Sequence, residues 1–235
     1  MEDVSHGKFG LTGNQLKIVA MLTMLCDHVG FYLLPEIGVL RIIGRLSFPI
    51  YAFMIAEGCR YTKNRTKYLL LVFLLGLACQ VVYFVFMQSL WQCVLITFSL
   101  AIGNIYLLDL AREKKRLTYW LLWAFGIAAT WFLCVELPRL LPQTDFHIDY
   151  GFLGVMVPVF VYLGQNQWQK LFLMAGPLAL LAASTGDIQW FSFVSVALLA
   201  LYNGKRGKRK MKYLFYLFYP LHLAALYGIK LLLKI

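Results

Sequence analysis

The amino-acid sequence predicts an all-α protein, a polytopic bundle of helices that crosses a membrane. Of the 235 residues, 61% are apolar and only 14% are charged, whereas soluble domains average about 45–50% apolar and about 25% charged residues. The basic residues are also clustered, because 14 of the 22 lysines and arginines lie in the three segments 60–67, 112–116 and 205–212. The stretches between these segments are apolar and long enough to span a bilayer. This composition excludes a soluble cytoplasmic enzyme, a nucleic-acid-binding domain and a disordered chain.

Nine apolar segments are predicted to cross the membrane. A helix needs about 20 residues to cross roughly 30 Å of hydrocarbon, and about 17–25 are tolerated. The predicted spans are residues 15–34, 38–59, 68–88, 91–111, 117–137, 150–164, 170–186, 189–203 and 213–233. The sixth and eighth are short, so the expected number is nine to within one. We expect residues 1–235 to form a single domain.

Polar and basic segments separate consecutive predicted spans and set their boundaries. The polar start MEDVSHGKFGLTGNQ has no cleavable signal-peptide pattern, and LPEIG forms a tight turn between the first two spans. The basic segment 60–67 separates the second span from the third, and 112–116 separates the fourth from the fifth. The polar sequence DFHIDYG precedes the sixth span, the loop 165–170 the seventh, TGDIQ the eighth and the basic segment 205–212 the ninth.

The positions of the basic residues predict that the N-terminus is cytoplasmic. Lysine and arginine in short loops favour the cytoplasmic side of a membrane. With nine alternating spans, the three basic segments, Lys8, Lys17 and Lys170 all face that side, which accounts for 17 of the 22 basic residues. Arg139 is the only basic residue in a predicted outer loop. The number of spans and the charge distribution therefore support each other.

Charged residues lie inside the first two spans, where they are energetically costly. Asp27 and His28 belong to the first span, and Arg41, Arg45 and Glu57 to the second. A charged side chain at the bilayer centre costs on the order of 2.5–3.5 kcal/mol, and such residues usually face a bundle interior or a wet cavity. These five residues are therefore candidates for a functional site.

The short turn between these spans is expected to bring Asp27 and Arg45 to the same depth. Each lies nine residues from Glu36, which at about 1.5 Å per residue is roughly 13 Å below the outer turn. Arg41 and Arg45 share one helix face, and His28 points about 100° away from Asp27. One interpretation is an ion pair that fixes the packing of the hairpin. A functional site is favoured because buried pairs add little stability and an imidazole titrates near neutral pH.

Two further groups of polar residues are candidates. His147, Asp149 and Tyr150 lie in DFHIDYG, at the predicted outer mouth, where a solvated loop is the alternative interpretation. His222 lies near the middle of the last span, two residues after Pro220, which removes one helical hydrogen bond. A cavity beside His222 is one interpretation, and a histidine bonded to a backbone carbonyl in the core is the other.

Several enzyme motifs are absent from the sequence. It has no Walker loop, dinucleotide-binding GxGxxG, HExxH or GxSxG. The five cysteines form no CxxC pair of the metal-binding type. We therefore expect no nucleotide hydrolysis, no metal site and no nucleic-acid partner.

Several motifs, in order along the chain, resemble those of the TraX family. They are LTGNQLKIVAMLTMLCDHVG, LRIIGRLSFPIYAFMIAEGCRYTKNRTKYLL, DYGFLGV, LYNGKRG and FYLFYPLHLAALY, which together run from Leu11 to about Tyr227. The family is typified by the protein that N-acetylates conjugative F-type pilin. It is related to the wider transmembrane acyltransferases, including lysosomal heparan glucosaminide acetyltransferase. The resemblance implies a multi-pass protein of the bacterial cytoplasmic membrane. It also implies acetyl-CoA as the cytoplasmic donor and an outer acceptor, a pilin-like peptide or a sugar.

Such a reaction suits the charged residues of the spans. His28 would act as general base or as a transient acetyl carrier, with His222 as the competing candidate. Arg45, with Arg41, would stabilise the oxyanion, and Asp27 would orient a partner or hold the arginines. The candidate substrate-binding residues are Arg41, Glu57, His147, Asp149 and Tyr150.

Two other functions remain open at this stage. A proton-coupled transporter or ion carrier would relay protons through Asp27, His28 and Glu57. A non-enzymatic assembly factor would pack against pilin-like helices and would tolerate loss of His28. Binding of acetyl-CoA and release of free thiol distinguish the acetyltransferase from both.

Overall fold

The computed structural model describes residues 10–208 and 211–233, which are helical and contain two isolated β-bridges but no β-strand. The chain divides into two compact units, Met1–Met54 with Ala182–Ile235, and Ile55–Leu181. Their boundaries fall inside two continuous helices, α3 (Ser47–Tyr61) and α9 (Gln167–Thr185). The single domain over residues 1–235 stays a prediction. Part of the basic segment 205–212, namely Arg209 and Lys210, and also Lys8 lie outside the described residues.

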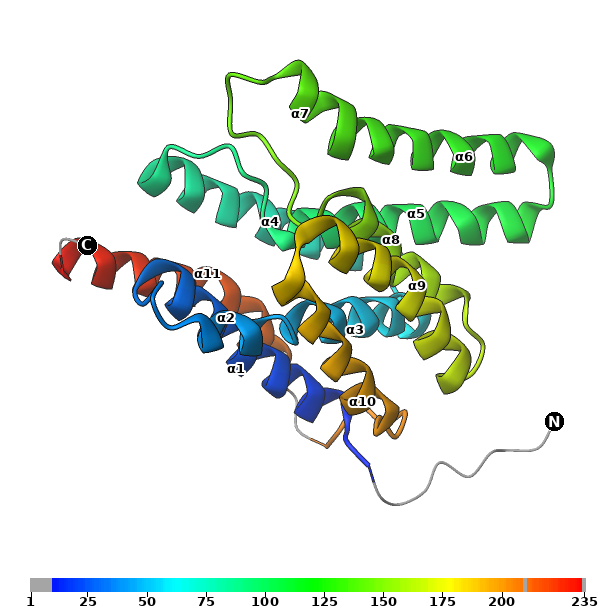
Figure 1. Ribbon diagram of the computed structural model, residues 1–235. Coiled ribbons are helices and arrows are strands. Elements are labelled where there is room, and N and C mark those ends of the chain that lie inside the picture. The colour runs from blue at the N-terminus through cyan, green and yellow to red at the C-terminus, as the bar shows by residue number, and fades with distance from the viewer. Residues whose placement is uncertain (1–9, 209–210, 234–235) are drawn as a thin grey trace. The chain divides into compact units, whose positions relative to one another are not determined.

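The first unit is built around α1. Its helices are α1 (Gly13–Tyr32), α2 (Gly38–Gly44), the start of α3, the 3₁₀ helix η2 (Asp187–Phe193), α10 (Val194–Ala200) and α11 (Lys212–Leu233). A capping box begins α1, because the Thr12 hydroxyl accepts from the Gln15 backbone N–H and the Gln15 side chain accepts from the Thr12 backbone N–H. Within this unit α1 packs against α2 on one side and α11 on the other (Figure 1).

The second predicted span is interrupted in the structure. It consists of α2 and α3, separated at Arg45 and Leu46. Pro49 explains the break, because proline lacks a backbone N–H and its ring crowds the carbonyl four residues earlier, which is that of Arg45. Residues Gly38–Tyr61 together remain long and apolar enough to cross a membrane. The break therefore places Arg45 at the end of a helix.

The second unit is a stack of helices around α5 (Figure 1). Its members, besides parts of α3 and α9, are α4 (Arg65–Met87), α5 (Val94–Lys114), α6 (Leu117–Trp131), the π-helical η1 (Phe132–Glu136), α7 (Leu137–Leu140) and α8 (Gly151–Leu163). Helix α5 contacts α4, α6 and α8. The π-helical turn precedes Pro138, which cannot donate to the carbonyl of Cys134, and such turns accommodate this loss.

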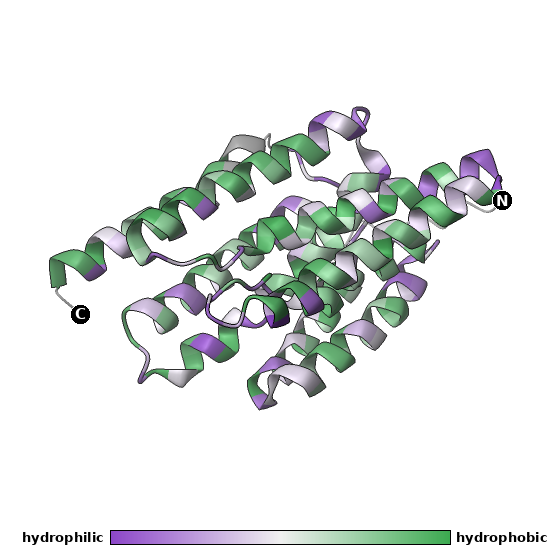
Figure 2. Ribbon diagram, turned by 90° about the horizontal axis from the view of Figure 1, so that it is seen from above, coloured by the Kyte–Doolittle hydropathy of each residue, from purple (hydrophilic) through white to green (hydrophobic). Residues whose placement is uncertain are grey.

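Four helices in the described part of the chain are long and apolar enough to cross a membrane. They are Gly38–Tyr61, Arg65–Met87, Val94–Lys114 and Leu117–Leu140. Only 17% of Arg65–Met87 and 11% of Leu117–Leu140 is buried over the most apolar window, and such large exposed apolar surfaces are typical of membrane or protein contact. Figure 2 shows apolar residues along most of the helices and hydrophilic residues mainly at their ends and connections. The other predicted spans are shorter or more polar helices, so nine crossings and the orientation stay predictions.

Candidate functional site

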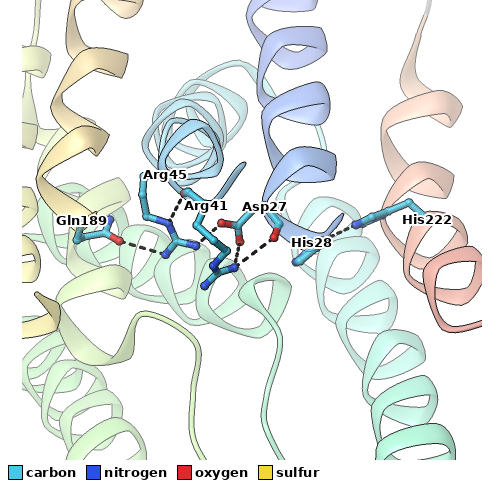
Figure 3. A network of polar contacts seen from close by, with 6 residues as sticks. All are labelled: Asp27, His28, Arg41, Arg45, Gln189 and His222. Carbon is cyan, nitrogen blue, oxygen red and sulfur yellow. Dashed lines mark hydrogen bonds and ion pairs between the residues drawn. The ribbon is translucent and has the colours of Figure 1, made fainter. Parts of the chain in front are cut away.

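Asp27 on α1 pairs with both arginines of the following segment. Its carboxylate accepts from Arg41 Nη1 at 2.8 Å and from Arg45 Nη2. Arg41 Nη1 also donates to the backbone carbonyl of Asp27 at 3.3 Å. The Asp27–Arg45 contact is the one that equal depth in the hairpin predicts. Figure 3 shows both guanidinium groups converging on the carboxylate.

Small residues allow α1 and α2 to approach closely at this point. A Cβ atom at Gly44 would overlap the Asp27 carboxylate, and one at Gly30 would come within 2.8 Å of the Leu40 Cβ. Carbon atoms normally stay about 3.5–4.0 Å apart. The two glycines are therefore needed for the packing that brings Asp27 to its arginines.

A residue of η2 completes the Asp27–Arg network. Arg45 Nη1 donates to Gln189 Oε1 at 3.3 Å, and Arg45 Nε donates to the Arg41 carbonyl at 3.3 Å. Gln189 is 4% exposed and Asp27 is 9% exposed. The sequence pattern does not predict Gln189 as a site residue, although an amide in the mostly apolar segment after Asp187 is an available signal.

The Asp27–Arg network carries excess positive charge. Asp27, Arg41 and Arg45 comprise one carboxylate and two guanidiniums, a formal sum of +1. Such a fixed charge in a region of low dielectric favours a ligand group that becomes negative. No cluster of three histidine, cysteine or acidic residues able to hold a metal ion occurs among the residues that the structure describes.

His28 and His222 are in direct contact. Nδ1 of His28 lies 2.6 Å from Nε2 of His222, and the rings stack with centroids 4.9 Å apart. Nδ1 of His222 lies 2.8 Å from the carbonyl oxygen of Phe218, one turn earlier on α11. Sequence reasoning treated these histidines as competing candidates, but the structure joins them across 194 residues of chain. Asp27 points toward the arginines and His28 toward His222 (Figure 3), because adjacent side chains on a helix point in different directions.

Glu57 belongs to the second unit and has a different partner. Its carboxylate accepts from Lys170 Nζ of α9 at 2.6 Å, and both side chains are buried. The sequence analysis placed Lys170 in a cytoplasmic loop and did not identify this pair. Removal of one member of a buried ion pair is strongly destabilising, so Glu57 has a clear structural role here.

The residues of the loop before α8 are held by backbone contacts in the second unit. The N–H of Gln92 donates to the His147 carbonyl at 2.7 Å, and the N–H of Asp149 donates to the Gln92 carbonyl at 3.0 Å. The hydroxyl of Thr97 donates to the Asp149 carbonyl at 2.6 Å. Tyr150 precedes α8 in the left-handed conformation, with φ of 60°. The loop is thus an ordered part of this unit.

Two side chains of the same loop also contact the segment before α5. The exposed His147 ring lies 5.2 Å from the Trp91 ring. Asp145 accepts from the Ser89 hydroxyl and from the backbone N–H of Leu90. These two hydrogen bonds lower the pKa of the Asp145 carboxyl below its ordinary value.

Comparison with known proteins finds one matching family model and two bacterial relatives. The sequence model described as TraX protein matches residues 12–230. An uncharacterised protein of Rickettsia prowazekii (strain Madrid E) is 24% identical over 165 residues, 67% of this chain and 58% of that protein. A probable fimbrial assembly protein FimC, serogroup H1, of Dichelobacter nodosus is 33% identical over 73 residues, 29% of this chain and 30% of that protein. The chain therefore covers less than two thirds of these relatives, and no solved structure matches it significantly.

Proposed function

The chain belongs to the TraX family, and we propose that it is a membrane-embedded acetyltransferase. It moves an acetyl group from cytoplasmic acetyl-CoA to an amine or hydroxyl at the outer face of the bacterial cytoplasmic membrane. The observation that carries this proposal is the 2.6 Å contact between His28 and His222, beside the positively charged Asp27–Arg network. Imidazole is the side chain best suited to take a proton from an acceptor near neutral pH.

The hydrogen bonds of the histidine pair support His28 rather than His222 as the base. The Phe218 carbonyl can only accept, so Nδ1 of His222 carries a proton and, in the neutral ring, Nε2 is an acceptor. His28 must then donate from Nδ1 to that nitrogen. The lone pair of His28 therefore lies on its Nε2, which makes His28 the general base and His222 the residue that orients it.

The reaction then follows in two balanced steps. The acceptor nitrogen or oxygen attacks the thioester carbon while its proton passes to Nε2 of His28, and the carbonyl π electrons move to the oxygen. Arg45 and Arg41 stabilise the resulting oxyanion. Its collapse reforms the carbonyl and expels the CoA thiolate, which takes the proton from His28. His222 stabilises the charged form of His28 between the two steps, because it accepts from Nδ1.

The membrane topology supplies the direction of transfer. In this proposal the nine predicted spans place the N-terminus and the three basic segments in the cytoplasm, where CoA is available. The same predicted spans place the loop of His147, Asp149 and Tyr150 outside, on the side of the acceptor. The printed name of the Dichelobacter nodosus relative refers to fimbrial assembly, which supports a pilin-like peptide as the first acceptor to test, with a sugar as the second.

The decisive experiment combines binding and turnover. Detergent-purified protein is incubated with acetyl-CoA and either a short peptide amide with a free N-terminus or glucosamine, and CoA thiol release and acetylated product are measured. Acetyl-CoA should raise Tm, since a ligand at 100 times its Kd adds about 2.7 kcal/mol of stability, whereas ATP should not. His28→Ala should keep this shift and lose transfer.

The opposite results would change the assignment. Absence of both thermal stabilisation and thiol release over micromolar to millimolar acetyl-CoA would overturn the acetyltransferase. Uptake driven by a pH gradient in proteoliposomes would then identify a transporter. If the protein showed neither acetyl transfer nor uptake, the assembly factor would be the remaining function.

A further inference from the structure

Two buried polar groups of η2 lack hydrogen-bond partners among the described residues. They are Nε2 of Gln189 and the hydroxyl of Ser192, in residues that are 4% and 0% exposed. Both residues belong to η2, and positions three apart in a 3₁₀ helix lie on the same face. Their unpaired groups therefore lie along one side of η2, the side that meets Arg45.

The orientation of the Gln189 amide follows from its neighbour. The guanidinium of Arg45 can only donate, so the atom facing it at 3.3 Å must be the amide oxygen. The amide nitrogen, with its two N–H groups, is then the unpaired end. The hydroxyl of Ser192 is also a potential donor, because it rotates freely to suit an acceptor.

Unpaired buried donors are rare in proteins and destabilising. Here Gln189 contacts Arg45, part of a network whose formal charge is +1, and Ser192 lies on the same side of η2. The surroundings of Gln189 therefore favour an oxygen that carries or gains negative charge. Within the first unit, Asp27 is the carboxylate that faces these arginines, and both guanidiniums contact it. The combination of two unsatisfied donors with excess positive charge is that of an oxyanion-binding site.

We propose that Gln189 and Ser192 donate hydrogen bonds to the acyl carbonyl oxygen of the bound thioester and hold it as it becomes an oxyanion. This inference rests on the proposed function and adds two catalytic residues to it. When the acceptor attacks, the carbonyl π electrons move onto this oxygen, and they return when the carbon–sulfur bond breaks and CoA leaves as thiolate. Arg45 supplies the charge, Gln189 holds Arg45 through its amide oxygen, and the amide nitrogen meets the substrate.

The variant Gln189→Glu separates these two contacts. It keeps an oxygen toward Arg45, replaces the donating NH₂ by a second oxygen and removes the excess charge of the network. We expect kcat for acetyl transfer to fall about 100-fold or more, the usual effect of losing one oxyanion donor, while Tm is retained. Ser192→Ala should also lower kcat. Ser195→Ala is the matched control, because the hydroxyl of this buried serine already donates to the Ser192 carbonyl at 2.5 Å.

A binding measurement tests the contact between Gln189 and the acyl carbonyl oxygen when no acceptor is present. Wild-type protein should bind acetyl-CoA more tightly than S-ethyl-CoA, a thioether that lacks the carbonyl, and Gln189→Glu should lose this preference. Unchanged kcat and preference in Gln189→Glu, with active wild type, would overturn this inference alone. A fall in kcat that matches a fall in Tm would also overturn it, because the residue would then be structural. Failure of wild type to bind or turn over acetyl-CoA would instead overturn the proposed function.

Discussion

At the residue scale, the proposed reaction depends on the different partners that two adjacent side chains of α1 contact. Asp27 is engaged by Arg41 and Arg45, whereas His28 is engaged by His222. Because successive helical side chains diverge by about 100°, the acidic residue cannot orient the adjacent histidine. His28 instead contacts a second imidazole, that of His222, which lies against a backbone carbonyl of its own helix.

Loss of either histidine should reveal that they act as one unit. We expect His28→Ala to lower kcat by about 10²–10⁴-fold, the contribution of a general base, and His222→Ala to lower it less. The double variant should be no worse than His28→Ala, since residues that act together are not additive. Steady-state kinetics of the three variants measure this, with acetyl-CoA binding as the check on folding. Multiplicative losses would show that the histidines act independently.

At the element scale, the close approach of α1 and α2 makes the Asp27–Arg network possible. The short turn brings the helices together, Gly44 leaves room for the carboxylate, and Pro49 ends α2 beside Arg45. The same proline that breaks the predicted second span therefore contributes to the geometry of the site.

Gly44→Ala should damage this packing selectively. The added methyl group overlaps the Asp27 carboxylate, and overpacking typically costs about 1–3 kcal/mol. We expect a lower Tm and lower transfer activity. Gly38→Ala on the same helix is the control, because a Cβ there meets nothing within 4 Å. Equal Tm values for the two variants would contradict this account of the glycine.

The loop before α8 should make a pH-dependent contribution to the stability of the protein through Asp145. Hydrogen bonds from Ser89 and Leu90 lower the folded-state pKa of Asp145, so its stabilisation is present above the ordinary pKa of about 3.9 and is lost as pH falls through the lower, folded value. Wild-type Tm should exceed that of Asp145→Asn at pH 7, and the difference should disappear in strong acid. It should be small, because water screens the exposed carboxylate. A difference that grows on acidification would have the wrong sign.

At the scale of the whole molecule, the basic residues and the hairpins give the same alternation in the second unit. Arg65 at the start of α4 pairs with Asp109 near the end of α5 at 2.7 Å, so these ends lie together. Gln92, just before α5, forms backbone hydrogen bonds with the loop before α8, so the starts of α5 and α8 lie together at the other end of α5. This agrees with predicted crossings in which 60–67 and 112–116 share one side.

Reporter fusions along the chain test the predicted topology. Green fluorescent protein fused after residue 63, 115 or 166 should fluoresce, because these loops are expected in the cytoplasm. Alkaline phosphatase fused after residue 90 or 143 should be active, because these loops are expected outside. Phosphatase activity at residue 63 or 115 would show that the orientation is the reverse of the predicted one. The basic segments would then lie outside, away from cytoplasmic acetyl-CoA.

The class of the protein and one half of the candidate site could be predicted from composition and local spacing. Composition and apolar lengths predicted a helical membrane protein. The helical fold of the described residues, with four apolar helices long enough to cross a membrane, agrees. The pairing of Asp27 with Arg45 was predictable because a short turn links the two helices, so helical rise alone sets their relative depth.

Only the tertiary structure decided the contacts between distant segments. His28 meets His222, Arg45 meets Gln189 and Glu57 meets Lys170, across 194, 144 and 113 residues of chain. Periodicity assigns a residue to a helix face but does not determine which distant helix packs against it. Those pairings depend on the mutual packing of many helices, and no local spacing in the sequence encodes them.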